Sequence, residues 1–401
     1  MSFTLEKKQT KAHPIRAKGS TLIAKDTENL IIVYNKYKSS SPHPNPESQL
    51  AFNLVFCHGT GFNKSVWHYL IKQLYKLSQS HEVPWYLDTV LAVDALGHGD
   101  SSLANEGKMG CVYMWDDGAK DVIEIIKHER ETTGDMKNNF EARTVLVGHS
   151  MGGFTALYAS FLESTLFDSV VAIEPVIYGT PETEARFMRS FKKLVGLMMD
   201  TFDTEQDARD YFEKYSFTKR FQSDVLKDYV DDEVYKTKTK EGKYVYKAKC
   251  SKVSQMTTYL SSHMSIIKGM LALPLIRVPV FHVVGGAANW NLRESIDWIR
   301  NAIAPNMLAG AIDIDKGQHL VNSEQPNDVI KVINNALTKR DTDFKVSKPT
   351  VPEIALNGDR KALLDQQYNS ISNLDMENVY GYDNKKHIPF DLVANKPSSK
   401  L

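Results

Sequence analysis

The chain has 401 residues, of which 42% are apolar and 24% are charged. Lysine and arginine together number 49, as do aspartate and glutamate, so the formal net charge is zero. This balance argues against nucleic-acid binding, which usually needs a basic excess on one face, and the length favours a core domain with an insertion or a tail.

The three cysteines, Cys57, Cys111 and Cys250, form no C-x-x-C pair, which indicates a reducing compartment and gives no signal of a metal site. The opening segment MSFTLEKKQTKAHPIRAKGS is polar and lacks the apolar stretch of a secretory signal, although its basic residues leave a mitochondrial presequence as a minor alternative. The best candidate for a membrane span, IIKGMLALPLIRVPVFHVV, is broken by Lys268, Arg277 and two prolines. We therefore expect no transmembrane segment and a soluble protein.

Along the chain, apolar strands alternate with Gly-rich turns and helices. Residues 20–37 predict two short strands joined at a polar turn. Further strands are expected within 50–62, 88–102, 142–153, 167–176, 278–286 and 308–319, and helices within 154–165 and 326–337. Continuous apolar strands alternating with helices predict an α/β fold with a mostly parallel sheet that is covered on both faces.

The domain organisation follows from a change of composition in the middle of the chain. Residues 176–275 are polar, charge-rich and spotted with Met and Phe, and they predict several helices and no strands. About a hundred residues between two core strands is the size of a helical cap rather than of a loop. The predicted parts are an N-terminal extension (1–19), a core in two halves (20–175 and 276–340), the cap between these halves (176–275) and a polar tail with one short helix (341–401).

The pentapeptide GHSMG places Ser150 between the apolar TVLV and a predicted helix. This strand–turn–helix context is the one in which G-x-S-x-G marks a nucleophile elbow. Gly148 and Gly152 suit the sharp turn, because a side chain there would collide with neighbouring backbone. Ser150 is therefore the candidate nucleophile.

His319 is the candidate general base and acid among the 12 histidines of the chain. It lies in DKGQHLVNSEQP, directly after the last apolar strand and before the final helix, where it can reach over the sheet edge toward the elbow. His58, His98 and His149 belong to Gly-containing turns, where structural hydrogen bonds are expected, and His263 is expected to pack on a cap helix.

A Gly-rich turn, CHGTGF, follows an early strand and supplies a candidate oxyanion hole. Such a turn can aim a backbone N–H at a tetrahedral oxyanion, and we expect the donor to be Thr60 or Gly61. Its partner is expected to be the N–H of Met151, the residue after the nucleophile.

Taken together, HGTG, DALGHGDS, GHSMGG and GQHLVNSEQP occur in an order that resembles the α/β-hydrolase superfamily, over about residues 25–175 and 276–338. More narrowly, LVFCHGTGFNKSVW, the W-x-D-G-A-x-D that begins at Trp115, and the EPV that begins at Glu174 resemble peroxisomal lipase-type hydrolases of yeast and related fungal peroxisomal hydrolases of toxin biosynthesis. The resemblance implies the α/β-hydrolase fold with an inserted helical cap.

One departure from that family concerns the third member of the triad. Most members carry an aspartate after the penultimate core strand, where this chain has Ala288 in VGGAANW. Some members instead take the acid from the strand after the elbow helix, and that strand ends here at Glu174. The resemblance thus implies Glu174 as the triad acid; Asp313, Asp315 and Glu294 are the alternatives.

The residues and the resemblance imply a serine hydrolase, of the lipase or carboxylesterase type, that cleaves fatty acyl esters through an acyl-enzyme on Ser150. An acyl-CoA thioesterase would use the same Ser150 and His319. A catalytically inactive scaffold is the alternative from another class, since the usual aspartate is missing. No metal or organic cofactor is implied.

The chain ends in Ser399, Lys400 and Leu401, the S-K-L tripeptide read by the peroxisomal import receptor. It follows a polar, Pro-containing stretch. The sequence therefore predicts a protein of the peroxisomal matrix whose partners are this receptor and a small acyl ester. The assembly state stays open, with a homodimer among the alternatives.

Overall fold

The computed structural model describes residues 2–43, 49–80, 82–347 and 358–373. The strands are β1 (Phe3–Lys11), β2 (Ile31–Ser39), β3 (Leu50–Cys57), β4 (Trp85–Val93), β5 (Ala142–His149), β6 (Ser169–Ile173), β7 (Thr201–Phe202), β8 (Val234–Lys238), β9 (Tyr244–Ala248), β10 (Val280–Gly285) and β11 (Leu308–Ile314). The α-helices are α1 (His68–Gln79), α2 (Gly99–Ala104), α3 (Trp115–Thr132), α4 (Met151–Leu162), α5 (Pro181–Val195), α6 (Glu205–Asp210), α7 (Ser223–Glu233), α8 (Lys252–Leu260), α9 (Ser262–Ala272), α10 (Arg293–Ala302), α11 (Val321–Glu324), α12 (Pro326–Ser347) and α14 (Arg360–Ser372).

The central sheet has the strand order β1-β2-β4-β3-β5-β6-β10-β11 among the described residues. The pairs from β4 to β11 are parallel, whereas β1 with β2 and β2 with β4 are antiparallel. The chain passes from β3 to β4 on one side and then to β5 on the other. The strand order therefore reverses between β3 and β5, and ligands of open α/β sheets bind at the carboxyl ends of the strands at such a point.

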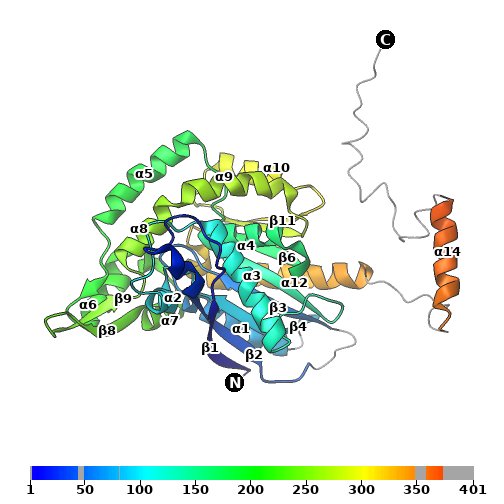
Figure 1. Ribbon diagram of the computed structural model, residues 1–401, viewed down its shortest axis with the longest axis horizontal. Helices are drawn as coiled ribbons and strands as arrows, with labels where there is room; N and C mark the ends of the chain where they lie inside the picture. The colour runs from blue at the N-terminus through cyan, green and yellow to red at the C-terminus, as the bar shows by residue number, and fades with distance from the viewer. Residues whose placement is uncertain (1, 44–48, 81, 348–357, 374–401) are drawn as a thin grey trace, which may run out of the picture. The chain divides into compact units, whose positions relative to one another are not determined.

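Helices flank this sheet (Figure 1). Strands β3, β5 and β6 are almost wholly buried, and their residues are mostly apolar on both faces of the sheet. This is expected for parallel strands that lie between two layers of helices. Helices α3 and α4 share one buried cluster with strand residues such as Val55, Leu91 and Leu146. Helices α1 and α12 contact β4: Ser78 of α1 accepts the N–H of Leu87 at 2.8 Å, and Asn334 of α12 accepts the indole N–H of Trp85 at 3.2 Å. The predicted fold class is confirmed.

The first strands differ from the prediction. Phe3–Lys11 forms the edge strand β1 of the central sheet, although these residues were expected to be an extension. The prediction of two strands within 20–37 is wrong, because Ala24–Asn29 forms a 3₁₀ helix before β2. The segment between β1 and this helix is held to α3 by Asp121, which pairs with Arg16 at 2.7 Å and accepts the N–H of His13 at 2.9 Å.

The segment between β6 and β10 contains helices α5 to α9, but the prediction that it lacks strands is wrong. Strands β7, β9 and β8 form a small antiparallel sheet in that order. Strand β9, YVYKA, is rich in the strand-forming residues Tyr and Val, but it is only five residues long and lies between lysine-rich stretches. The division at 176 and 275 stays a prediction, and this segment is called the cap below; its small sheet and α6 lie to one side of the central strands (Figure 1).

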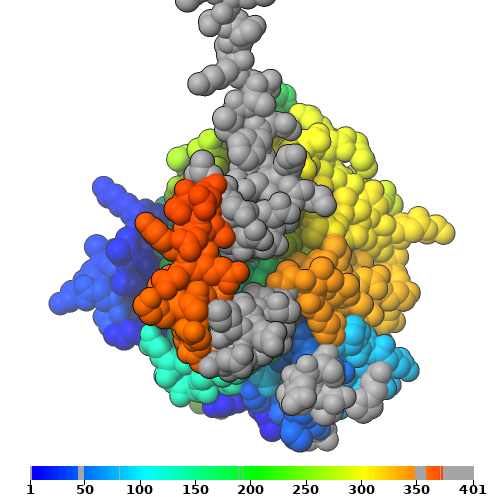
Figure 2. Space-filling view, turned by 90° about the vertical axis from the view of Figure 1, so that its right-hand side faces the viewer, coloured from blue at the N-terminus to red at the C-terminus, as the bar shows by residue number. Residues whose placement is uncertain are grey.

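The chain divides into two compact units, Met1–Asp343 and Phe344–Leu401. In the first unit, the yellow surface of the residues around 300 adjoins the light-orange surface of α12 (Figure 2). The second unit holds the helix α14, Arg360–Ser372. The Ser399-Lys400-Leu401 tripeptide lies outside the described residues. Among the described helices, none combines the length and the apolarity that crossing a membrane would demand.

Candidate active site

Ser150 stands at the turn between β5 and α4 with φ 55° and ψ −115°, a strained backbone for a residue with a side chain. Two glycines make the turn feasible. A Cβ on Gly148 would lie 2.0 Å from the carbonyl oxygen of Gly152, and one on Gly152 would lie 2.1 Å from the carbonyl oxygen of Cys57. The backbone N–H of Ser150 donates to the carbonyl oxygen of Ile173 at 3.0 Å, and this hydrogen bond links the turn to the end of the neighbouring strand β6.

His319 follows β11 and brings its ring to the elbow. Its Nε2 lies 3.1 Å from the Oγ of Ser150, and its Nδ1 lies 3.0 Å from Oε2 of Glu174. A carboxylate can only accept a hydrogen bond, so Nδ1 carries the proton and Nε2 accepts the hydroxyl of Ser150. The three side chains therefore form a continuous hydrogen-bonded chain, the arrangement in which a serine is activated for nucleophilic attack.

Glu174 comes directly after β6 and is fully buried. Besides His319, its Oε1 accepts the N–H of Gly285 at 2.7 Å, and its Oε2 accepts the side-chain amide of Asn291 at 2.8 Å. These donors compensate the carboxylate for the loss of water. Its φ is 48°, so the backbone at Glu174 is in the left-handed region, like that at Ser150.

The other candidate acids lie elsewhere. Asp313 pairs with Arg300 and with Arg293, and Glu294 accepts the hydroxyl of Tyr178 at 2.7 Å. Asp315 has no recorded contact with His319 among the described residues. Asn291, which sequence reasoning missed, donates a hydrogen bond to the carboxylate that faces His319, and its position three residues after the expected aspartate site, Ala288, is a hint in the sequence.

The oxyanion candidates require one correction. The N–H of Gly61 donates to Nε2 of His98 at 3.0 Å, so it is not free for a substrate. Thr60 has no acceptor for its N–H among the described residues, and its hydroxyl lies 3.7 Å from the sulfur of Met151. Met151 is the first residue of α4, where backbone N–H groups have no partner within the helix. Thr60 and Met151 thus remain as the candidate pair of donors.

The remaining histidines near the site have structural hydrogen bonds. His149 Nε2 donates to the carbonyl oxygen of His319 at 2.8 Å, and His58 Nδ1 donates to that of Gly59 at 2.8 Å. Burial lowers the pKa of His58, and it lowers those of His98 and His149 to well below their usual range. These three rings are therefore neutral near pH 7, as befits side chains that fix loops.

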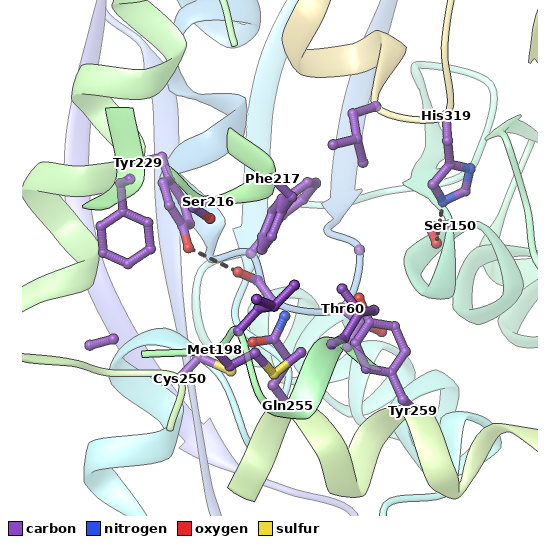
Figure 3. Close-up of a pocket in the computed structure, with 18 of the residues that line it drawn as sticks. Thr60, Ser150, Met198, Ser216, Phe217, Tyr229, Cys250, Gln255, Tyr259 and His319 are labelled. Atoms are coloured by element: carbon purple, nitrogen blue, oxygen red, sulfur yellow. Dashed lines mark hydrogen bonds between the residues drawn. The ribbon is translucent and has the colours of Figure 1, made fainter. Parts of the chain in front are cut away.

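A cavity of about 370 Å³ opens on Ser150 and His319, a volume suited to a small organic ligand. Figure 3 shows Ser150 and His319 on one side of this pocket and Tyr229 and Cys250 on the other, with Phe217 between them. More than half of its lining residues belong to the cap, and most of these are apolar or aromatic, including Leu194, Leu197, Met198, Met199, Tyr211, Phe212 and Tyr259. The site therefore joins a polar reaction centre to an apolar pocket.

Comparison with known proteins places this geometry in context. The alpha/beta hydrolase family model matches residues 54–332. Peroxisomal membrane protein LPX1 of Saccharomyces cerevisiae is 28% identical over 384 residues, which are 92% of this chain and 96% of that protein. The crystal structure of the peroxisomal alpha-beta-hydrolase Lpx1 from the same organism aligns with a TM-score of 0.76 and 28% identity, over 93% of this chain and 98% of that one.

A third similarity is partial. The type I acyl-CoA thioesterase mpaH of Penicillium roqueforti is 26% identical over 163 residues, which are 41% of this chain and 34% of that protein.

Proposed function

The chain belongs to the alpha/beta hydrolase family, and from this premise we propose that it is a serine hydrolase that cleaves carboxylic esters of fatty acyl groups. The observation that carries the proposal is the hydrogen-bonded chain from Ser150 through His319 to the buried Glu174. The apolar pocket beside Ser150 supports an acyl chain as the bound part of the substrate.

In the proposed reaction, the Oγ of Ser150 attacks the ester carbonyl while Nε2 of His319 takes its proton. The N–H groups of Thr60 and Met151 stabilise the oxyanion that forms. His319 then gives the proton to the departing alcohol, which leaves an acyl group on Ser150. A water molecule then attacks the carbonyl of the acyl group while His319 takes its proton. His319 returns this proton to the Oγ of Ser150, and the fatty acid is released. Glu174 keeps the proton on Nδ1 and stabilises the imidazolium form of His319.

A thioesterase acting on acyl-CoA is the second candidate. It is supported by the similarity to mpaH, which is named as an acyl-CoA thioesterase, and the same three side chains would serve it. A catalytically inactive scaffold is less well supported, because Glu174 supplies the carboxylate that seemed missing after β10.

The experiment is labelling of the purified full-length protein with a fluorophosphonate probe, followed by peptide mapping. We expect modification at Ser150 that is lost in His319→Ala. Hydrolysis of matched p-nitrophenyl esters and acyl-CoA thioesters of one chain length then separates the esterase from the thioesterase. Folded protein that fails to label would support the scaffold instead.

We also propose that the chain is imported into peroxisomes through Ser399, Lys400 and Leu401, in agreement with the peroxisomal relative. A fluorescent protein fused to the N-terminus should co-localise with a peroxisomal marker. Removal of Leu401 should leave the fusion dispersed in the cytosol. Unchanged localisation after this removal would exclude the tripeptide as the address.

A further inference from the structure

Trp290 covers one face of the His319 ring. The two ring centroids lie 5.1 Å apart with an angle of 25° between the planes, which is a stacked arrangement. Trp290 also lines the pocket that opens on Ser150. Its indole N–H is buried and has no acceptor among the described residues, so Trp290 contacts the triad by stacking on the His319 ring.

The two neighbours of Trp290 also have contacts that bear on the site. The side chain of Asn291 donates to Glu174 at 2.8 Å. The carbonyl oxygen of Asn289 accepts a hydrogen bond from Arg186 of α5, also at 2.8 Å. Three consecutive residues therefore contact the triad base, the triad acid and a helix of the cap.

Helix α5 packs aromatic side chains onto Trp290. The ring of Phe187 lies 5.3 Å from that of Trp290, and the ring of Phe191 lies 6.4 Å from it. Phe191 also stacks on Tyr259 of α8, with centroids 4.4 Å apart. A continuous row of aromatic rings thus runs from the cap helix to the imidazole of His319.

This row has a mechanical consequence. A histidine with a hydrogen bond at each nitrogen is fixed along the line of those bonds, but its ring can still tilt about that line. A flat neighbour on one face restricts the tilt, and displacement of a catalytic group by about 1 Å can cost on the order of 100-fold in rate. Aromatic contacts of this kind contribute enough to change an equilibrium about 2- to 10-fold per pair.

We propose that Trp290 is a positioning residue for His319 and that residues 289–291 couple the seating of cap helix α5 to the alignment of the triad. When α5 lies against Trp290, the His319 ring is held with Nε2 toward Ser150. When α5 moves away, Trp290 loses Phe187 and Phe191, and the ring is less restrained. This inference rests on the proposed function, since it concerns the reactivity of Ser150.

The alternative is that Trp290 is only a wall of the pocket. In that case its removal would weaken binding of long acyl chains and raise KM, but it would leave the intrinsic reactivity of Ser150 unchanged. The two roles therefore differ in their effect on a small probe that does not fill the pocket.

The experiment uses the full-length protein and the variants Trp290→Ala, Trp290→Phe and the double variant Phe187→Ala/Phe191→Ala. Val195→Ala, at an exposed position of the same helix, is the matched control. The rate of fluorophosphonate labelling at Ser150 is measured across pH 5–9, together with kcat and KM for p-nitrophenyl acetate. Thermal unfolding and circular dichroism monitor the fold of every variant.

We expect Trp290→Ala to lower the labelling rate and kcat by about 10- to 100-fold, with KM for the small ester nearly unchanged. The midpoint of the pH profile of labelling should also move, which partial unfolding alone would not cause. Trp290→Phe, which keeps a flat ring, should recover to within about 3-fold of the wild type, and the double variant on α5 should lose about 3- to 10-fold.

A labelling rate and pH midpoint in Trp290→Ala equal to those of the wild type would overturn the inference. So would full reactivity in the double variant on α5, because the cap helix would then have no influence on the triad. In both cases Ser150 of the wild type still labels, so the proposed function survives. Failure of the wild type itself to label contradicts the proposed function and, with it, this inference.

Discussion

The carboxylate of Glu174 lies 3.0 Å from Nδ1 of His319, although 145 positions separate the two residues in the chain. Glu174 directly follows β6 and His319 follows β11, and these strands flank β10 in the central sheet. The contact therefore depends on the parallel pairing of β6, β10 and β11, which brings the carboxyl ends of all three strands to one edge. Four predictions test what this arrangement and its surroundings do.

The first prediction concerns the charge of Glu174. In Glu174→Gln, the amide can keep the shape of the side chain but not the negative charge that stabilises the imidazolium of His319. We expect kcat for an activated ester to fall by about 10³- to 10⁴-fold with little change in KM. Glu294→Gln, which alters a carboxylate that faces Tyr178 rather than His319, should stay within about 3-fold of the wild type. Equal activity of Glu174→Gln and wild type would remove Glu174 from the mechanism.

The second prediction concerns the support of that carboxylate. Asn291→Ala removes the amide that donates to Oε2 of Glu174 at 2.8 Å. Because the same oxygen faces His319, we expect kcat to fall by about 10-fold. The exposed Asn306 is a matched control, and Asn306→Ala should leave kcat unchanged. A drop in activity of the same size in both variants would show that the effect is not specific to the triad.

The third prediction concerns the space beside the nucleophile. A Cβ on Gly59 would lie 2.8 Å from Nδ1 of His149 and 3.3 Å from Cβ of Ser150. Gly59→Ala should therefore push on the elbow and lower kcat by about 10- to 100-fold in steady-state ester hydrolysis. Gly196→Ala is the control, because Gly196 has helical dihedral angles and the added Cβ would lie 3.7 Å from the carbonyl oxygen of Lys193, an ordinary contact. Full activity in Gly59→Ala would mean that the turn at Ser150 accommodates the added methyl group without loss of catalysis.

The fourth prediction concerns stability against pH. Burial raises the pKa of Glu233 to about 8 from 4.5, while hydrogen bonds from Asn63 and Cys250 oppose the shift. Between these two pKa values, the folded protein holds one more proton than the unfolded chain does. The free energy of unfolding therefore falls as the pH rises through this window, by up to about 1.4 kcal/mol per pH unit from this group.

Urea unfolding at several pH values from 5 to 8.5 measures this slope. In Glu233→Gln, which has no proton to lose, the slope should be shallower than in the wild type, whatever the change in absolute stability. Parallel curves for the two proteins would assign the pH dependence to other groups.

How much of this could be predicted from the sequence varies from residue to residue. The sharp turn at Ser150 was predictable because it is local: two glycines and an apolar strand stand within a few positions of the serine. The approach of His319 to this turn could be expected from its place after the last strand, and the catalytic roles of both residues stay predictions. Glu174 was reached only because Ala288 stands where an aspartate is usual, and because relatives of this kind offer one other place for the acid.

Other features left no mark in the sequence. The engagement of the Gly61 N–H by His98 was missed, because the two residues lie 37 positions apart and a Gly-rich turn looks the same whether its N–H groups are free or bonded. Asn291 and Trp290 were missed for a similar reason, since their partners lie in the loops after β6 and β11 and on the cap. The small sheet of the cap was missed because its strands are short and their Val and Tyr residues stand beside lysines in a charge-rich segment.

The sequence by itself determined the fold class, the nucleophile elbow and the order of the candidate catalytic residues, because these depend on apolar periodicity and on glycines at fixed spacing. Only the tertiary structure decided which carboxylate meets His319, which backbone N–H groups stay free beside Ser150, and which side chains hold the triad. Those outcomes depend on contacts between residues far apart in the chain, and the pairing of the strands brings these residues together, which no local pattern records.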